Sequence, residues 1–270
     1  MLKYRLNGGQ GICMKRIMLI VSYDGTGYCG WQLQQEVLTV ESVLNKALSA
    51  LLGEEIKVIG ASRTDSGVHA RGNVAVFDTE TRILPEKICY ALNVRLPEDI
   101  RVQSSGEVPL TFHPRRVSSR KTYEYRIQNR KIPMPMERLY SDFVYYDLEA
   151  EAMQAAAAYL VGEHDFKSFC SVKTQAEETV RTIYRLEVMR QGDIITISVT
   201  GSGFLYNMVR IIAGTLIEVG RGAILPERMK SILAGCDRSL AGPTAPEQGL
   251  TLIGIEYKEK DISIGGGSDV

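Results

Sequence analysis

One loop of the sequence concentrates residue types that can act as an acid, a base or a nucleophile. Between two apolar segments, the loop Gly60–Gly72 holds a single carboxylate, Asp65, together with Arg63, Arg71 and His69. Its glycines let the backbone turn sharply and let a ligand approach closely. An acid surrounded by cations is expected to have a low pKa and to stay ionised. Such a group suits a nucleophile or a charge stabiliser, whereas a general acid needs a raised pKa.

The composition of this loop also fits two other interpretations. A β-turn whose aspartate accepts hydrogen bonds from backbone N–H groups has a similar composition, and on composition alone it is favoured. The stretch Thr64-Asp65-Ser66-Gly67 also contains the D-[ST]-G triplet of aspartic proteases. Those enzymes need two carboxylates that share a proton, and this sequence offers one triplet, flanked by cations. A protease is therefore excluded.

An arginine in an otherwise apolar segment is the second chemical feature. Arg210 is the only charged residue between Phe204 and Ile217. Helical spacing predicts a helix over Phe204–Val219 whose buried face is formed by Leu205, Met208, Val209, Ile212, Leu216 and Val219. A buried guanidinium needs a partner, and Asp65 is the attractive candidate. An arginine whose charged end reaches solvent is the alternative.

A basic stretch with alternating tyrosines is the third feature. Residues 121–127 alternate as in a strand, which places Tyr123 and Tyr125 on one face. Aromatic side chains beside cations are typical of sheets that stack RNA bases, although ordinary cross-strand packing is the alternative. The surrounding stretch Pro114–Arg138 has eight Lys or Arg against two Glu, in a chain with 32 basic and 32 acidic residues. Any attraction to nucleic acid is expected there.

The elements that must position these residues follow one order twice. Strands are predicted at Arg16–Tyr23, Ile56–Gly60, Asn73–Thr79 and Ile100–Val108, and then at Lys121–Gln128, Tyr140–Tyr146, Thr182–Arg190, Ile194–Thr200 and Thr251–Tyr257. Helices are predicted between Thr39 and Gly53, from Pro85 to Asn93, at Glu149–Val161, at Phe204–Val219 and from Pro226. The result is an α+β fold of two β-α-β-β-α-β halves with largely antiparallel sheets.

This order divides the chain into four parts. We expect a disordered leader at residues 1–13, an N-terminal half with the Asp65 loop at 14–113, a C-terminal half with the tyrosine strand and the arginine helix at 114–260, and a flexible tail at 261–270. Two halves agree with a length of 270 residues, which exceeds one typical domain.

Composition excludes several classes of protein. The five cysteines form no C-x-x-C pair and the three histidines are far apart, so we expect neither a metal site nor disulfides, and a reducing cytoplasm fits. No apolar run approaches the ~18 residues of a membrane span. No G-K-[ST] motif is present, so a nucleotide cofactor is unsupported.

Short motifs in the chain resemble, in their order, those of the tRNA pseudouridine synthases that modify positions 38, 39 and 40 of the anticodon stem-loop. They are Tyr23-Asp24-Gly25-Thr26-Gly27-Tyr28, Gly30-Trp31-Gln32, Arg63-Thr64-Asp65-Ser66-Gly67-Val68-His69-Ala70, Phe112-His113, Thr122-Tyr123-Glu124-Tyr125, Asp165-Phe166, Ser168-Phe169, Arg181-Thr182-Ile183, Asn207-Met208-Val209-Arg210, Ala245-Pro246 and Gly249-Leu250. The resemblance extends from about Lys15 to Tyr257. Ser62 and Ser66 stand where the family often has Gly and Ala.

The resemblance implies conversion of uridine to pseudouridine without a cofactor or metal. It implies that Asp65 is the catalytic aspartate, which attacks or stabilises the ribose or the base. Tyr123 would stack on the target base and is the family's candidate for removing the C5 proton. Arg210 would hold Asp65 ionised through a salt bridge, and Arg63 would help to displace the uridine from the stem. The family fold joins both halves in one antiparallel sheet flanked by helices, and the family acts as a homodimer on tRNA.

Two other functions compete with this one. A non-catalytic RNA-binding module would need the basic tyrosine strand and would not need Asp65. A hydrolytic N-glycosidase would also use an ionised aspartate near a ribose, but it would release free uracil and leave an abasic product.

Overall fold

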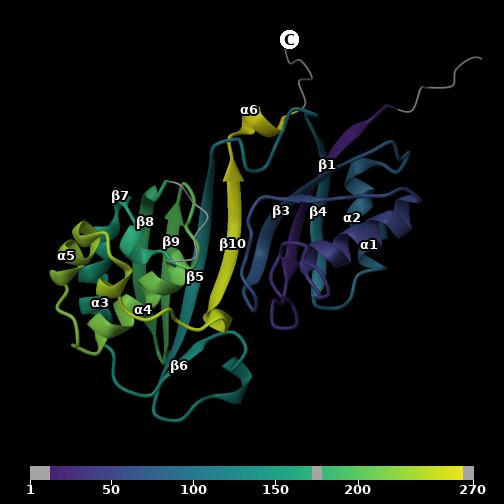
Figure 1. Ribbon diagram of the computed structural model, residues 1–270. Coiled ribbons are helices and arrows are strands. Elements are labelled where there is room, and N and C mark those ends of the chain that lie inside the picture. Colours follow the sequence, from purple (N-terminus) through teal and green to yellow (C-terminus); the bar gives the residue numbers. More distant parts are fainter. Residues whose placement is uncertain (1–12, 172–177, 264–270) are drawn as a thin grey trace, which may run out of the picture.

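The computed structural model describes residues 13–171 and 178–263, and its N-terminal half has the predicted order of elements (Figure 1). The elements are β1 (Lys15–Tyr23), α1 (Val40–Leu52), β2 (Ile59–Gly60), β3 (His69–Thr79), α2 (Ile88–Asn93) and β4 (Ile100–Val108). A short 3-10 turn at Pro85–Lys87 leads into α2. The expected leader at 1–13 lies outside the described residues except for Cys13.

The C-terminal half repeats this order with additions. Its elements are β5 (Ser119–Asn129), β6 (Asp142–Val144), α3 (Ala150–Ala157), β7 (Gly162–Asp165), β8 (Val180–Gln191), β9 (Ile194–Gly201), α4 (Met208–Gly220), α5 (Arg228–Gly235) and β10 (Leu250–Tyr257). A short helix, α6 (Glu259–Ile262), takes in the first residues of the stretch expected to be a flexible tail, and 264–270 lie outside the described residues. The strand β7 was not predicted.

One sheet unites the two halves in the order β4-β1-β3-β10-β5-β9-β8-β7, with β2 paired to β3 and β6 paired to β5. The first half contributes β4-β1-β3-β2 and the second contributes β10-β5-β9-β8, so the strand order is the same in both. Most neighbours are antiparallel. The prediction of two β-α-β-β-α-β halves in a shared, mainly antiparallel sheet is confirmed.

The halves meet at a short parallel pairing. β10 pairs with β3 at Thr251↔His69 and Leu252↔Ala70, whereas β2 pairs with the other part of β3, at Ile59↔Val76. Figure 1 shows β10 in the middle of the molecule, between the strands of the two halves. The start of β3 is therefore the point where both halves can contribute side chains.

Apolar residues at helical spacing hold the helices against the sheet. In α1, Val40, Leu44 and Leu48 are buried, as the spacing predicts. Thr39 and Ser42 cap the first turn reciprocally, and Gly53 ends the helix in a left-handed conformation with φ 74°. The predicted buried face of α4 is confirmed in full. No helix of the described residues is long and apolar enough to cross a membrane.

Two boundaries differ from the prediction in ways that shape the loop and the arginine helix. The strand expected at Ile56–Gly60 is reduced to Ile59–Gly60, and β3 begins at His69 instead of Asn73, because β10 pairs with these first residues. The loop between them is Ala61–Val68. The helix expected from Phe204 begins at Met208, because Asn207 adopts a left-handed φ of 61°.

Candidate active site

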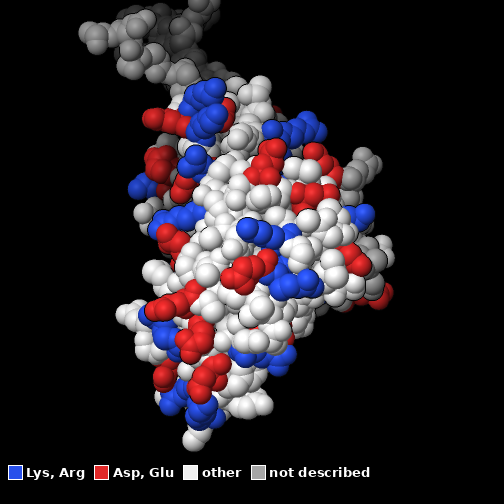
Figure 2. All heavy atoms as spheres, turned by 90° about the vertical axis from the view of Figure 1, so that its left-hand side faces the viewer, with Lys and Arg blue, Asp and Glu red and all other residues white. Residues whose placement is uncertain are grey.

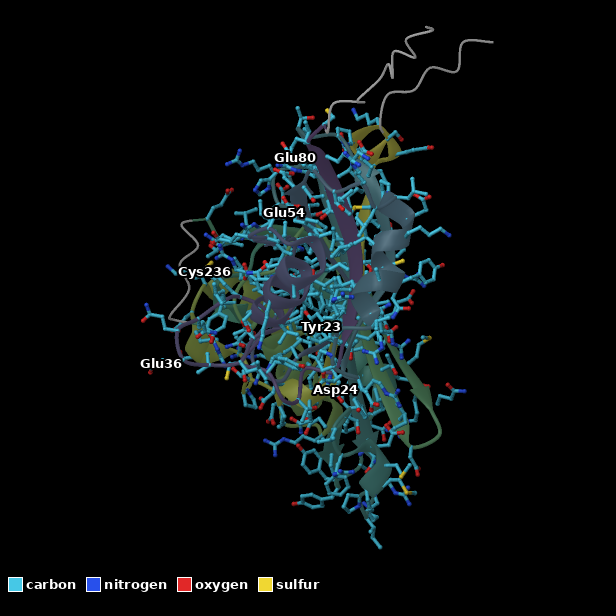
Figure 3. All side chains as sticks on the ribbon, turned by 90° about the vertical axis from the view of Figure 1, so that its right-hand side faces the viewer. Tyr23, Asp24, Glu36, Glu54, Glu80 and Cys236 are labelled. Carbon is cyan, nitrogen blue, oxygen red and sulfur yellow. The ribbon has the colours of Figure 1, made fainter. Side chains whose placement is uncertain are left out.

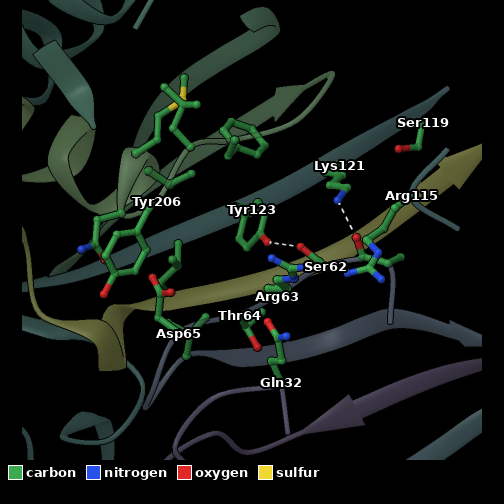
Figure 4. A pocket seen from close by; sticks show the side chains of 18 of the residues that line it. Gln32, Ser62, Arg63, Thr64, Asp65, Arg115, Ser119, Lys121, Tyr123 and Tyr206 are labelled. Carbon is green, nitrogen blue, oxygen red and sulfur yellow. Dashed lines mark hydrogen bonds between the residues drawn. The ribbon is translucent and has the colours of Figure 1, made fainter. Parts of the chain in front are cut away.

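A cavity of about 1220 Å³ lies where the loop Ala61–Val68 faces β5 and the segment before α4. The charged side chains that line it are Arg63, Asp65, Arg115, Lys121 and Arg181. Of the residues that the structure describes, Asp65 is thus the only acid at the cavity, beside four cations. Figure 4 shows Asp65 beside Tyr206 at one end of the cavity and Lys121 with Arg115 at the other. A cavity of this size and charge suits part of a large anionic substrate.

The backbone of residues 28–31 supports the loop from within its own half. The backbone N–H of Trp31 donates to the carbonyl of Thr64 at 3.0 Å, and that of Gly67 donates to the carbonyl of Tyr28 at 3.3 Å. At Gly30, which has φ +82°, an added Cβ would lie 2.6 Å from the Thr64 carbonyl oxygen. Only glycine permits both this φ and this close approach.

Buried side chains fix Ser62 and Thr64, the part of the loop just before Asp65. The hydroxyl of Tyr23 lies 2.7 Å from Oγ1 of Thr64. The side chain of Asn73 donates to the carbonyl of Ser62 at 3.0 Å and accepts from the backbone N–H of Ser62 at 3.3 Å. Figure 3 shows Tyr23 beside Asp24 at one end of β1, whereas Glu54 and Glu80 lie towards the opposite end of the strand. The loop is therefore a preorganised element.

Burial raises the pKa of Asp65, and the positive charge of Arg210 lowers it by a smaller amount. The expected low pKa is wrong, because the neighbouring cations in the sequence do not contact the carboxylate. His69 turns away, with its Nε2 2.9 Å from the carbonyl oxygen of Leu139. Among the described residues no side chain donates a hydrogen bond to Asp65. Its carboxyl group is half-buried and faces the cavity.

Arg210 is mostly buried, as predicted, but its salt bridge is not with Asp65. Its guanidinium donates to Glu247 at 3.0 Å, to the carbonyl of Ala245 at 2.7 Å and to Oδ1 of Asn207 at 3.1 Å. The expected ion pair is wrong because Glu247, on the segment before β10, takes the place of the aspartate. Arg210 acts on Asp65 only through its field.

Glu247 was not singled out from the sequence, and it links the arginine helix to the loop. A Cβ added at Gly67, where φ is +75°, would lie 2.4 Å from Cγ of Glu247. The hydroxyl of Tyr125 donates to the carbonyl of Pro246 at 2.9 Å and so holds the same segment. Little in the sequence indicated Glu247, because a single glutamate in a loop belongs to no periodic pattern.

Tyr123 lies on β5, and its side chain reaches the loop from the other half. Its hydroxyl is 2.7 Å from Oγ of Ser62, and its ring packs edge-on against Phe204 with centroids 5.3 Å apart. Burial raises the pKa of Tyr123 to about 12. Tyr125 and Ile127 are buried on the same face, as the alternation predicts. The site thus pairs a hydroxyl-bearing ring with Asp65 across one cavity.

The basic stretch Pro114–Arg138 is divided by the fold. Arg115 and Lys121 line the cavity, whereas others form ion pairs elsewhere. These pairs are Arg126–Glu137 at 3.2 Å, Arg130–Asp193 at 3.5 Å and Lys131–Asp147 at 3.0 Å. The outer face of the C-terminal half shows basic and acidic side chains interspersed (Figure 2). Of this basic stretch, only Arg115 and Lys121 therefore contribute charge to the cavity.

Three more residues line the cavity. Arg63 was predicted from the sequence, whereas Tyr206 and Lys121 were not. Arg63 is exposed and has no ion pair among the described residues. Tyr206, which is 46% exposed, precedes α4 and its ring lies near Asp65 (Figure 4). The Nζ of Lys121 donates to the carbonyl of Ala61 at 2.9 Å. An exposed aromatic and a lone lysine carry little signal in a sequence until the fold places them.

Comparison with known proteins identifies the family. A family model described as tRNA pseudouridine synthase matches residues 19–115 and 156–258. The protein named tRNA pseudouridine synthase A from Brevibacillus brevis is 47% identical over 90% of this chain and 100% of its own length. Those from a Thermoanaerobacter species and from Ruminiclostridium cellulolyticum are each 49% identical with the same coverage. The chain therefore belongs to the tRNA pseudouridine synthase family, and the prediction of an isomerase is confirmed.

A more distant similarity exists among solved structures. The archaeal box H/ACA sRNP Nop10–Cbf5 complex matches with 11% identity and a TM-score of 0.34, covering 87% of this chain and 46% of that chain. A similarity at this level carries no argument about the site.

Proposed function

We propose that the protein converts uridine to pseudouridine at one or more of positions 38, 39 and 40 in the anticodon stem-loop of tRNA, with Asp65 as the catalytic residue. The observation that carries the proposal is the place of Asp65: among the described residues it is the only acid that lines a cavity with four cations. The anionic backbone of RNA matches those cations, and one carboxylate suffices for an isomerisation that needs no proton-sharing pair.

The reaction exchanges one bond for another within the same nucleotide. The N1–C1′ bond breaks, the uracil turns, and C5 forms a bond to C1′ while its proton is removed. N1 ends with a proton, so no atom is gained or lost. Asp65 takes part by attack on the ribose or on the base, and both points of attack fit a carboxylate facing an open cavity. No cofactor is required at any step.

The surroundings of Asp65 suit this role. Burial leaves its carboxylate poorly solvated, as the raised pKa reflects, and a poorly solvated carboxylate is a stronger nucleophile. The field of Arg210 favours the ionised form without occupying the oxygens, because the guanidinium is bonded to Glu247. The carboxylate oxygens therefore stay available to a substrate.

Tyr123 and Arg63 complete the proposed site. The ring of Tyr123 would contact the target base, and its hydroxyl would relay the C5 proton: it would take that proton as it passes its own to the hydroxyl of Ser62, to which it is bonded, and on to solvent in the cavity. Because the pKa of Tyr123 is about 12, the phenol is neutral until that step. Arg63 would help to displace the uridine from the stem, and displacement costs a few kcal/mol that the cations of the cavity can offset.

The experiment that tests the function uses an unmodified tRNA transcript. The transcript is incubated with the protein, and pseudouridine is mapped by carbodiimide modification. We expect new signals in the anticodon arm and no free uracil. Absence of modification there would refute the assignment, and free uracil with an abasic product would indicate a hydrolytic glycosidase. Conversion by Asp65→Asn at the wild-type rate would refute the role of Asp65.

We also propose that the protein acts as a homodimer on tRNA. The support is the family to which the chain belongs. Light scattering after size-exclusion chromatography, with and without tRNA, measures the mass directly. A monomer mass under both conditions would refute the dimer.

A further inference from the structure

Three cations line the cavity beyond Asp65: Arg115 and Lys121 lie at the end remote from it, and Arg63 lies between that end and Asp65. Arg63 comes from the loop, Arg115 from the segment that joins the two halves, and Lys121 from β5 (Figure 4). They are close enough to affect one another, because Arg63 lowers the pKa of Arg115 and Arg115 lowers the pKa of Lys121. Three mutually repelling charges brought together by three separate elements are costly unless an anion binds them.

None of the three forms a salt bridge within the part of the chain that the structure describes. Glu41 is the only acid whose charge raises the pKa of Arg115, and its carboxylate already accepts the backbone N–H of Leu33 at 2.9 Å. Lys121 is bonded to a neutral carbonyl, that of Ala61. The cluster therefore keeps a net positive charge, because one acid lies near three cations and none of the described acids pairs with them directly.

The segment that carries Arg115 is held in place by both halves. The carbonyl of Pro114 accepts the hydroxyl of Tyr257 at 2.8 Å, and the backbone N–H of Arg115 donates to Nδ1 of His113 at 3.2 Å. The carbonyl of Phe112 accepts from Arg16 at 2.7 Å. The backbone that carries Arg115 is thus fixed at the junction of the two halves, which keeps this arginine near the loop and β5.

We propose that Arg63, Arg115 and Lys121 form a subsite for a backbone phosphodiester of the RNA strand, next to the nucleotide that reacts at Asp65. This inference rests on the proposed function and adds to it the contact that sets the register of the strand in the cavity. A guanidinium can bind two phosphate oxygens at once, and an ammonium adds a point charge. The phosphate of a neighbouring nucleotide would neutralise the cluster while the target base lies near Tyr123.

Lys121 gives this subsite a dependence on pH. Burial, followed by the charge of Arg115, lowers its pKa to about 8. Its bonded partner, the carbonyl of Ala61, is neutral, and Arg115 is the charged group that acts on it, so no described acid favours its charged form. A bound phosphate favours the charged ammonium and so restores the pKa of Lys121 towards its usual value. Binding of RNA above pH 8 should therefore take up a proton.

The test measures the dissociation constant of an unmodified tRNA transcript in the Asp65→Asn background, so that no conversion occurs during the titration. We expect Lys121→Met to weaken binding about tenfold at pH 7. The slope of log K against log salt should become shallower by about one unit, which corresponds to the loss of one phosphate contact. The matched control is Arg120→Met. Arg120 is the adjacent residue, lies over the ring of Tyr184 and does not line the cavity, so its loss should leave the slope unchanged.

A pH series separates a phosphate contact from a structural role. In the protein that keeps Lys121, binding should weaken about tenfold from pH 7 to pH 9. At pH 9 a lysine of pKa about 8 is mostly neutral in the free protein. Lys121→Arg should remove this dependence, since arginine stays charged. Ionisation of the RNA bases is common to both proteins and cancels in the comparison.

Some outcomes would overturn the subsite. An unchanged dissociation constant and salt slope in Lys121→Met would do so. If Lys121→Met with Asp65 intact then turned over more slowly at saturating tRNA, Lys121 would only position Ala61. Should Lys121→Met unfold, Arg115→Met against Arg116→Met tests the same cluster at exposed residues. These binding results stand apart from conversion, so a wild-type protein that forms no pseudouridine would refute the proposed function alone.

Discussion

The connection from β2 to β3 and the connection from β8 to β9 occupy the same place in the two halves, yet they differ in form. β8 and β9 pair as far as Gln191↔Ile194, and a two-residue turn with Gly192 at φ +59° closes the hairpin. β2 pairs with β3 at only Ile59↔Val76 and Gly60↔Ala75, and the chain then leaves the sheet as the loop Ala61–Val68. One connection is a tight hairpin, and the other carries the candidate catalytic residue.

The difference shows where a site can arise in a duplicated fold. Where β2 stops pairing, β10 of the other half pairs with the start of β3 instead. The loop therefore lies at the junction and is held by its own half through Tyr28 and by the other half through Ser62 with Tyr123. The repeated topology supplies the two halves of one sheet, and the cavity forms at the place where the repetition is broken.

The largest effect is expected from a pair of aspartates at the two connections. Asp65→Asn should reduce conversion by about three orders of magnitude or more, because an amide cannot act as the nucleophile. Asp193→Asn, at the hairpin, should change conversion by less than about twofold, since its side chain is exposed and pairs only with Arg130. Single-turnover conversion of a tRNA transcript measures both. Equal losses in the two variants would refute the contrast.

A second pair of variants compares tyrosines on the first strands of the two halves. Each hydroxyl bonds to the same loop, that of Tyr23 to Thr64 and that of Tyr123 to Ser62. Only Tyr123 lines the cavity. Tyr123→Phe should lower turnover about a hundredfold if its hydroxyl handles the C5 proton. Tyr23→Phe should lower stability by about 1 kcal/mol with nearly unchanged turnover.

Rates at saturating tRNA and unfolding by urea distinguish these two effects. A Tyr123→Phe variant with wild-type turnover would leave Tyr123 with a packing role only. A large loss of turnover in a Tyr23→Phe variant that is fully folded would show that both hydroxyls act in the same way. That result would contradict the difference between the halves.

Periodicity predicted the fold well because it reports which face of an element is buried. The buried face of α4 and the alternation around Tyr123 are direct readings of that kind. The conformation of the loop and the pairing of the charged residues around it depend on contacts between segments distant in the sequence, and no local pattern reveals those contacts. Arg210 binds Glu247 and not Asp65, and this choice is decided by how the segment before β10 lies against Gly67. The pKa of Asp65 was misjudged for the same reason.

Two glycines give a smaller effect on stability. At Gly30, an added methyl group would lie 2.6 Å from the carbonyl oxygen of Thr64, and the φ is unfavourable for alanine as well. Gly30→Ala should therefore lower the free energy of unfolding by about 3 kcal/mol. Gly192 has nothing within 4 Å of an added Cβ, so Gly192→Ala should cost about 1 kcal/mol, for its φ alone. Denaturant unfolding measures both. A similar cost at the two sites would mean that the loop yields to the methyl group and is not fixed by residues 28–31.

The smallest effect concerns stability as a function of pH. Because burial raises the pKa of Asp65, the folded protein favours the neutral acid, so the stability that this group contributes is present at low pH and is lost as pH rises through the raised pKa. Asp65→Asn stays neutral throughout. Its free energy of unfolding should therefore match that of the wild type near pH 3.5 and exceed it at pH 7. Urea unfolding at several pH values, with Asp193→Asn as the exposed control, checks this expectation. A difference that does not grow with pH would show that the loop solvates the carboxylate, and the poorly solvated nucleophile proposed for this half would then be wrong.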